Sequence, residues 1–425
     1  MFSKSKIDKA GKYLSQKVFD SESDELEAEI IFDEYRQAHL QPLTETTIQI
    51  QNWLSSYQGQ YYIAQRLKRK PQILRKLRRF SVRLTQLQDI AGNRIIVDTN
   101  RDIDKIRLFI KEKLSSSNDL KIYKERDYRE LGRDDTGYRA LHIILEKNGL
   151  KIELQIRSSA QHYWSESIER TSVIYGYRLK ENIGNKKVLE YFKLLSNVFY
   201  EIESGREPNP EIKIKLDKKR EEAEKIINST SKEKAKTLFS SVHDGVLKTL
   251  TSVESKCRNN LNNWILVFDW NSGSFINWEA IPRDPKEAYR AYSKNESIYS
   301  EEEGYEVVLI GSSSVSMIRK THSHYFGIDG YDNILENLDK SIIGFSSRKR
   351  IDSGSRRILN VLKRRSYWGK RGVSYNTLKN HYCNSFVGFD DSLEYLIELG
   401  LILRNGRKGA LSLRIEKQKE IGLYL

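Results

Sequence analysis

Side chains that could handle phosphate groups are gathered between residues 66 and 157 of this 425-residue sequence. Phosphoryl chemistry needs cations to hold a polyphosphate, a divalent metal ion to neutralise developing charge, and a carboxylate near the attacking hydroxyl. The basic stretch 66–79 offers the cations, and Asp89 and Glu153 offer carboxylates from two separate strand-like runs. Because such pairs commonly hold Mg²⁺, we expect Asp89 and Glu153 to bind this ion.

The basic stretch also has an ordinary structural interpretation. Ile73, Leu74 and Leu77 give residues 66–79 a short apolar stripe with helical spacing. Its cations could therefore belong to a solvated helix face rather than to a phosphate site. The stretch alone does not decide between the two.

A β-hairpin is expected to position Glu153. Strand-like runs at 141–146 and 150–157 flank Asn148-Gly149, a pair that tolerates the positive φ of a tight primed turn. Alternation along the second run places two sets of side chains on opposite faces, Ile152, Leu154 and Ile156 against Glu153, Gln155 and Arg157. Three polar groups therefore share one surface.

Residues 61–170 resemble the RelA/SpoT alarmone synthetases in five motifs that occur in the order of that family. The motifs are Arg66-x-Lys68 with Lys76, Asp89-x-x-Gly92-x-Arg94, Arg126-Asp127-Tyr128, Gly137-Tyr138-Arg139-Ala140-Leu141-His142 and Glu153-x-Gln155-Ile156-Arg157. Each motif alone has a structural explanation, such as a turn-capping aspartate or a packed tyrosine. Chance would have to place all five in one order, which favours the resemblance.

The resemblance implies transfer of pyrophosphate from ATP to a ribose 3′-hydroxyl, with Mg²⁺ as the cofactor. It implies Asp89 and Glu153 as catalytic metal ligands, with Glu153 also helping to activate the hydroxyl. The ATP-binding residues would be Arg66, Lys68, Lys76 and Arg94, and the acceptor-binding residues Tyr138, His142, Gln155 and Arg157. Tyr138 would stack on the acceptor base. His162 and Trp164 resemble a family helix motif and are expected to be structural.

Departures from the family pattern leave the acceptor open. Gln72 stands where a serine is usual, and Glu169 where a histidine is usual. Asp134 takes the place of a common lysine, and its charge would oppose a nucleotide diphosphate unless Arg133 compensates. The acceptor is either a guanosine nucleotide, giving (p)ppGpp-type products, or a tRNA 3′ end, as in a toxic relative. A third hypothesis is an inactive RNA- or DNA-binding regulator, against which the retained carboxylates argue.

Composition predicts the surface charge of the protein and the compartment in which it works. A net charge of +15 and a pI near 9.4 predict a surface that attracts phosphates. Cys257 and Cys383 match no disulfide or zinc pattern, and no apolar run reaches the length of a membrane span. We therefore expect a cytoplasmic protein without a membrane partner, and a homo-oligomer is left open. With only His39 upstream of the motifs, no hydrolase domain is expected.

The expected fold is α+β, with a nucleotidyltransferase-like mixed sheet flanked by helices. We divide the chain into an N-terminal helical region, a RelA/SpoT-like synthetase core, a charged helical extension, an α/β accessory domain and a winged-helix-like module, at residues 1–60, 61–180, 181–250, 251–345 and 346–425. In the last module, acidic residues on the third helix disfavour reading of a DNA groove by that helix. Dimerisation and nucleic-acid binding are both open roles for it.

Overall fold

A computed structural model describes most of the chain. The described residues are 2–19, 21–59, 61–133, 136–206, 208–230, 262–269, 274–281, 284–301, 303–312, 353–383, 389–405 and 409–425. They fall into two compact units, one ending at residue 312 and one starting at residue 353.

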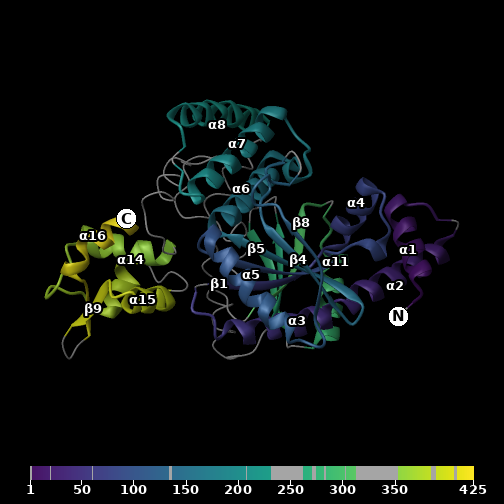
Figure 1. Cartoon of the computed structure of the whole chain (residues 1–425), viewed down its shortest axis with the longest axis horizontal. Coiled ribbons are helices and arrows are strands. Elements are labelled where there is room, and N and C mark those ends of the chain that lie inside the picture. Colours follow the sequence, from purple (N-terminus) through teal and green to yellow (C-terminus); the bar gives the residue numbers. More distant parts are fainter. Residues whose placement is uncertain are drawn as a thin grey trace. The chain divides into compact units, whose positions relative to one another are not determined.

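An eight-stranded mixed sheet organises the first unit (Figure 1). The strands are β1 (Tyr61–Leu67), β2 (Ala91–Val97), β3 (Lys121–Asp127), β4 (Leu141–Lys147), β5 (Leu150–Ser158), β6 (Asn262–Asp269), β7 (Ser274–Ile281) and β8 (Tyr305–Ser312). Their order is β3-β4-β5-β2-β1-β8-β6-β7. β2 and β5 run parallel and the other neighbours run antiparallel. The expected mixed sheet is confirmed.

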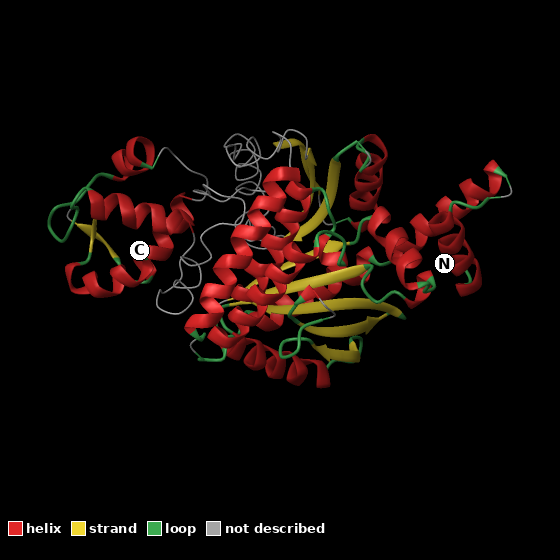
Figure 2. Ribbon diagram, turned by 90° about the horizontal axis from the view of Figure 1, so that it is seen from above, coloured by secondary structure: helices red, strands yellow, loops and turns green. Residues whose placement is uncertain are grey.

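Helices flank this sheet, as Figure 2 shows. They are α1 (Lys4–Gln16), α2 (Glu22–Ala38), α3 (Leu40–Leu54), α4 (Lys70–Phe80), α5 (Asn100–Ser115), α6 (Ser159–Tyr175), α7 (Lys186–Glu203), α8 (Pro210–Thr230) and α11 (Pro285–Ile298). Short 3-10 turns lie at Leu84–Gln86 and Leu179–Glu181. No described helix is long and apolar enough to cross a membrane.

The two faces of the central strands have different chemistry. On one face, Ile63, Ile95 and Ile156 are buried in a cluster with apolar residues of α3 and α5. Alternation along the strands sends Arg66, Arg94 and the polar residues of β5 to the other face. The predicted alternation in β5 is confirmed, because Ile152, Leu154 and Ile156 are fully buried. One face of the sheet is therefore core, and the other is free for a site.

The hairpin that carries Glu153 has the predicted turn. Asn148 and Gly149 have φ values of 53° and 74°, the positive values that a two-residue primed turn requires. The turn joins β4 to β5, and Lys147 pairs with Leu150 in the register. Local sequence therefore sets the register that places Glu153 on the polar face.

The described strands of residues 251–345 belong to the central sheet. We expected residues 251–345 to form a separate α/β domain, with strands near 264–269 and 306–311. These strands are present as β6 and β8, but β8 pairs with β1 and extends the central sheet. A buried contact supports this, because Gln65 of β1 donates to Asn263 of β6 over 3.3 Å. The pairing buries the edge of β1, which would otherwise expose unpaired backbone groups.

The second unit is small and mixed. It contains α14 (Ser353–Arg364), a π-helical turn (Thr377–Tyr382), α15 (Phe389–Glu398), the hairpin β9 (Ile402–Asn405) and β10 (Ala410–Leu413), a 3-10 turn (Ile415–Lys417) and α16 (Gln418–Tyr424). Val373 pairs with Leu411 as an isolated bridge beside the hairpin. Three helical segments followed by a hairpin is the order expected for a winged-helix-like module.

Candidate active site

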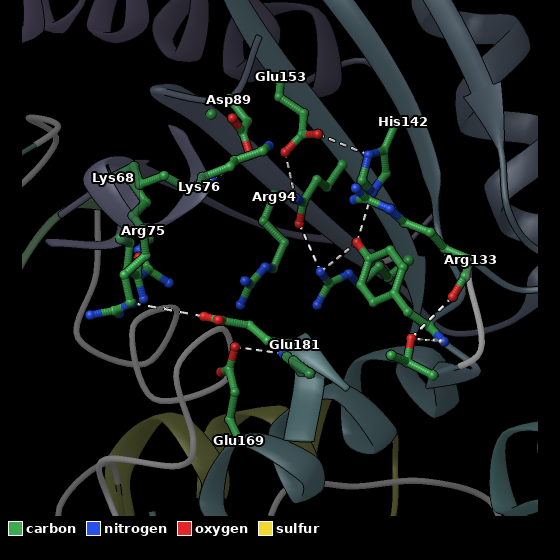
Figure 3. Close-up of a pocket in the computed structure, with 18 of the residues that line it drawn as sticks. Lys68, Arg75, Lys76, Asp89, Arg94, Arg133, His142, Glu153, Glu169 and Glu181 are labelled. Atoms are coloured by element: carbon green, nitrogen blue, oxygen red, sulfur yellow. Dashed lines mark hydrogen bonds and ion pairs between the residues drawn. The ribbon is translucent and has the colours of Figure 1, made fainter. Parts of the chain in front are cut away.

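A cavity of about 320 Å³ opens on the polar face of the sheet. This volume is typical of a small-molecule site. Each of the ten site residues expected from the sequence lines it, namely Arg66, Lys68, Lys76, Asp89, Arg94, Tyr138, His142, Glu153, Gln155 and Arg157. Figure 3 shows Asp89 and Glu153 near one another, with Arg94 reaching into the cavity from the strand beside them.

Neighbouring strands set the spacing of these groups. In the parallel pair β2 and β5, Gly92 lies beside Glu153 and Arg94 beside Gln155. A Cβ atom on Gly92 would lie 3.0 Å from the carbonyl oxygen of Glu153. Glycine in this motif therefore leaves room between the strands at the point where the two carboxylates meet.

Helix α4 supplies cations from one side of the cavity. Ile73 and Leu77 are buried in the core, and this fixes which side of the helix faces the site. Arg75 and Lys76 consequently line the cavity, while the adjacent Arg78 is exposed and does not. Of the two interpretations of the basic stretch, the structure favours cations aimed at a pocket. Arg66 does not belong to the helix, because it lies on β1.

Asp89 is held between two ammonium groups. The Nζ atoms of Lys68 and Lys76 both contact Oδ2 of Asp89, in the second case at 2.6 Å. Burial alone would raise the pKa of the Asp89 carboxyl, but the two ammonium groups hold it well below its usual range. Burial and the charge of Lys68 lower the pKa of Lys76. Asp89 is therefore ionised at neutral pH.

A chain of hydrogen bonds runs from Glu153 to Arg157. Oε1 of Glu153 lies 2.8 Å from Nδ1 of His142, whose Nε2 lies 2.7 Å from the hydroxyl of Tyr138. Arg157 donates to the same hydroxyl over 2.8 Å. Burial disfavours the imidazolium, but the oxygens of Tyr138 and Glu153 raise the pKa of His142 to about 9. Burial alone would raise the pKa of Glu153, yet His142 holds it below its usual range. Glu153 is thus ionised and fixed in place.

The donor set suits a divalent cation. Oδ1 of Asp89 is buried and has no hydrogen-bond partner among the described residues, although Oδ2 has two. A buried carboxylate oxygen without a partner is costly, and a cation would satisfy it. The described residues include no cluster of three or more acidic, histidine or cysteine ligands. A Mg²⁺ ion here would take Asp89 and Glu153 from the chain and the rest of its ligands from phosphate oxygens and water.

Several residues of the cavity were not expected from the sequence. These are Ala64, Phe80, Thr136, Lys180 and Glu181. Arg75 and Arg79 also line the cavity and belong to the basic stretch 66–79. Lys180 donates to Oε1 of Glu169 over 2.5 Å and to Ser165 over 2.6 Å. Glu169, which stands in place of the family's usual histidine, is thereby matched by a cation. No motif of the sequence signals Lys180, because its partner lies on a preceding helix.

Two further expectations concern residues around the cavity. Trp164 is buried and donates to the carbonyl of Phe192 over 2.7 Å, as expected for a structural residue. Arg133 lines the cavity, with its guanidinium 5.7 Å from the centre of the Tyr128 ring. Asp134, on which the choice of acceptor depends, lies outside the described residues.

A comparison with protein families gives the decisive match. Residues 65–180 match the family described as "Region found in RelA / SpoT proteins". These residues form a RelA/SpoT domain. The expected resemblance is thereby confirmed for residues 65–180. The matched segment contains all ten of the expected site residues.

Solved structures similar to the chain include a GTP pyrophosphokinase family protein and small alarmone synthetases. A GTP pyrophosphokinase family protein from Streptococcus pneumoniae is 23% identical, with 45% of this chain and 96% of that chain covered and a TM-score of 0.35. Small alarmone synthetase 1 from Bacillus subtilis, bound to its product pppGpp, is 23% identical, with coverage of 40% and 90% and a TM-score of 0.33. Small alarmone synthetase 2 from Bacillus subtilis is 25% identical, with coverage of 44% and 96% and a TM-score of 0.33. No curated protein sequence matches this chain.

Proposed function

We propose that this chain transfers pyrophosphate from ATP to the 3′-hydroxyl of a guanosine nucleotide, GDP or GTP, to make (p)ppGpp-type products. The observation that carries the proposal is that Asp89 and Glu153 line one cavity together with the cations Arg66, Lys68, Lys76 and Arg94. In the proposed reaction the acceptor 3′-oxygen bonds to the β-phosphorus of ATP. The bond from this phosphorus to the α–β bridging oxygen breaks, and AMP leaves.

The cationic side of the cavity fits the donor. Arg66, Lys68, Lys76 and Arg94 come from β1, the following loop, α4 and β2, so they surround a polyphosphate rather than line one edge of it. Burial, followed by the charge of Arg157, lowers the pKa of Arg94 to about 10. An anion bound between the two guanidinium groups would counter their repulsion and stabilise the charged form of Arg94. We therefore assign this side to the triphosphate of ATP.

The Glu153 side of the cavity fits the acceptor hydroxyl. The Glu153 carboxylate is ionised and held from behind by His142 and Gln155, the latter donating over 2.6 Å. Held in this way, it accepts the hydrogen bond of the 3′-hydroxyl, orients an oxygen lone pair toward phosphorus, and takes the departing proton. Positioning of this kind is the main contribution a protein makes to phosphoryl transfer. A bound Mg²⁺ would supply charge neutralisation on the phosphate oxygens.

The acceptor base is assigned to Tyr138. Its hydroxyl is fixed by His142 and Arg157, and its partly exposed ring lines the cavity. A ring anchored by its hydroxyl is preorganised for stacking, because little side-chain freedom is lost on binding. This supports a purine nucleoside as the acceptor but does not distinguish a free nucleotide from the terminal adenosine of a tRNA.

The tRNA 3′ end is the second candidate, favoured by the net charge of +15 and by Asp134 in place of a lysine. One incubation separates the candidates. ATP labelled in its γ-phosphate is offered separately with GDP, GTP, ATP and deacylated tRNA, and the labelled product is resolved by size. We expect label on GDP or GTP. Label on tRNA alone would select the second candidate, and no label on any acceptor would refute the transferase.

A further inference from the structure

The second unit carries a basic and aromatic surface that the transferase site does not use. Between residues 353 and 425 the sequence has 14 lysines and arginines against six aspartates and glutamates. The acidic residues all come after residue 389, so the preceding part has eight cations and no carboxylate. The charge of this unit is therefore segregated along the chain.

The structure gathers part of this charge around two tyrosines. The rings of Tyr367 and Tyr382 stack with centroids 6.3 Å apart and an interplanar angle of 26°. The guanidinium of Arg365 lies 3.8 Å from the centre of the Tyr382 ring, and that of Arg371 lies 5.9 Å from the centre of the Tyr367 ring. We call these four residues the arginine–tyrosine cluster.

The cluster faces solvent. Arg365 and Arg371 are exposed, as are the neighbouring cations Lys363, Arg364 and Lys370, and both tyrosines are partly exposed. Among the described residues none of these five cations forms an ion pair with a carboxylate. Lys379, by contrast, is neutralised by Asp390 at 2.7 Å. The surface thus keeps its charge available for an external anion.

We propose that the arginine–tyrosine cluster binds single-stranded RNA. Cations provide phosphate contacts, and planar guanidinium and phenol groups provide stacking surfaces for unpaired bases. RNA presents unpaired bases in loops and at ends, whereas the bases of duplex DNA are stacked inside the helix. The acidic helix α15, with Asp390, Asp391, Glu394 and Glu398, repels a phosphate backbone and directs the nucleic acid to the cluster instead. This inference concerns a surface separate from the transferase residues.

The test measures binding of the full-length protein to a labelled single-stranded RNA of about 12 nucleotides by fluorescence anisotropy. The charge variant is Arg365→Gln with Arg371→Gln. Its matched control is Lys419→Gln with Lys215→Gln, which removes two exposed cations from α16 and α8. We expect only the charge variant to bind RNA more weakly. The slope of its log binding constant against log salt concentration should become shallower by about 1.4, because two phosphate contacts are lost.

A second pair of variants tests stacking. Tyr367→Leu should weaken RNA binding by roughly tenfold, whereas Tyr367→Phe should retain it, because the ring and not the hydroxyl makes the contact. Transfer of pyrophosphate to a free nucleotide should be the same in all of these variants. Failure of this proposal and failure of the proposed function are thereby distinguished.

Three results would overturn the proposal. The first is an equal loss of RNA affinity in the charge variant and its control. The second is equal RNA affinity of Tyr367→Leu and the wild type. The third is binding of single-stranded or duplex DNA that is as tight as binding of RNA. The first would indicate diffuse attraction by the whole basic surface. The last would assign the cluster to nucleic acid in general or to DNA.

Discussion

Arg75 on α4 donates to Glu301, 226 residues further along the chain, over 2.7 Å. Arg75 lines the cavity, while Glu301 precedes the strand β8 that extends the sheet. A second carboxylate, Glu181, lies 3.8 Å from Nε of Arg75. The segment that we expected to be a separate domain therefore reaches a residue of the site and fixes the direction of its guanidinium.

Glu301→Gln tests whether this contact positions the ATP side of the cavity. Losing the charge should free Arg75, and we expect KM for ATP to rise roughly fivefold with kcat nearly unchanged, as suits an ion pair worth ~1 kcal/mol. Glu303→Gln, on the same turn, is the matched control. Equal ATP kinetics in Glu301→Gln and wild type would remove Glu301 from any positioning role.

Asp89→Asn and Glu153→Gln test the carboxylate pair. Each change removes a charge needed to hold the metal, so we expect transfer to be lost while the fold persists. Initial rates are measured at saturating ATP, with thermal unfolding and circular dichroism as checks on the fold. Glu112→Gln, an exposed carboxylate on α5, should keep full activity. Near-wild-type turnover by either folded site variant would exclude the proposed site.

Charge reversal on α4 tests the donor side. Lys76→Glu should raise the ATP requirement steeply, because phosphate clamps act mainly through charge, and Arg66→Glu on β1 should do the same. Arg78→Glu is the control, since Arg78 lies on the same helix but is exposed and outside the cavity. The measurement is rate against ATP concentration. If Arg78→Glu were as harmful as Lys76→Glu, the helix would act through overall charge and not through a clamp.

The gathering of these residues at one cavity was predictable because their motifs are local and the fold brings them together. The Asn148-Gly149 turn and the alternation in β5 set the register of Glu153, and each is visible in a few residues of sequence. Pairing of β5 with its neighbour β2 then places Arg94 beside Gln155 at the site. Local sequence thus carries most of the geometry around Glu153.

The rest of the fold depends on contacts between distant residues. Strand β1 was not expected, because Gln65 interrupts its apolar alternation and is accommodated only by partners elsewhere, Thr47 and Asn263. The pairing of β1 with β8 joins Gln65 to Gly311 and has no local signal. Lys180 was missed for the same reason, since its partner Glu169 lies on a preceding helix.

His39 makes stability depend on pH. It is fully buried at the junction of α2 and α3, with Nδ1 2.8 Å from the carbonyl oxygen of Tyr35. Burial lowers its pKa from 6.5 to about 4. As pH falls below 6.5 the unfolded chain binds a proton that the folded chain does not, so stability is lost between pH 6.5 and about 4.

The His39 contribution can be measured by denaturant unfolding at pH 7.5 and pH 5. The histidine should account for about 2 kcal/mol of the wild-type loss over this interval. In His39→Asn the amide nitrogen can donate to the Tyr35 carbonyl, and the side chain does not titrate. The decrease in its free energy of unfolding between pH 7.5 and pH 5 should therefore be smaller than that of the wild type by about 2 kcal/mol. The same loss in both proteins would show that His39 is protonated in the folded state.

Tyr138 tests the acceptor side of the site. Base stacking contributes ~1 to 3 kcal/mol, so Tyr138→Ala should lower kcat/KM for any purine acceptor by roughly tenfold to a hundredfold. Tyr138→Phe keeps the ring but loses the hydroxyl that contacts His142 and Arg157, so it separates stacking from the hydrogen-bond chain. We expect it to retain most acceptor use and to lose part of kcat, since Glu153 is then held less firmly through His142. The measurement is rate against acceptor concentration at saturating ATP. Equal acceptor dependence in Tyr138→Ala and wild type would show that the base binds elsewhere in the cavity, and the assignment of its two sides would have to be reversed.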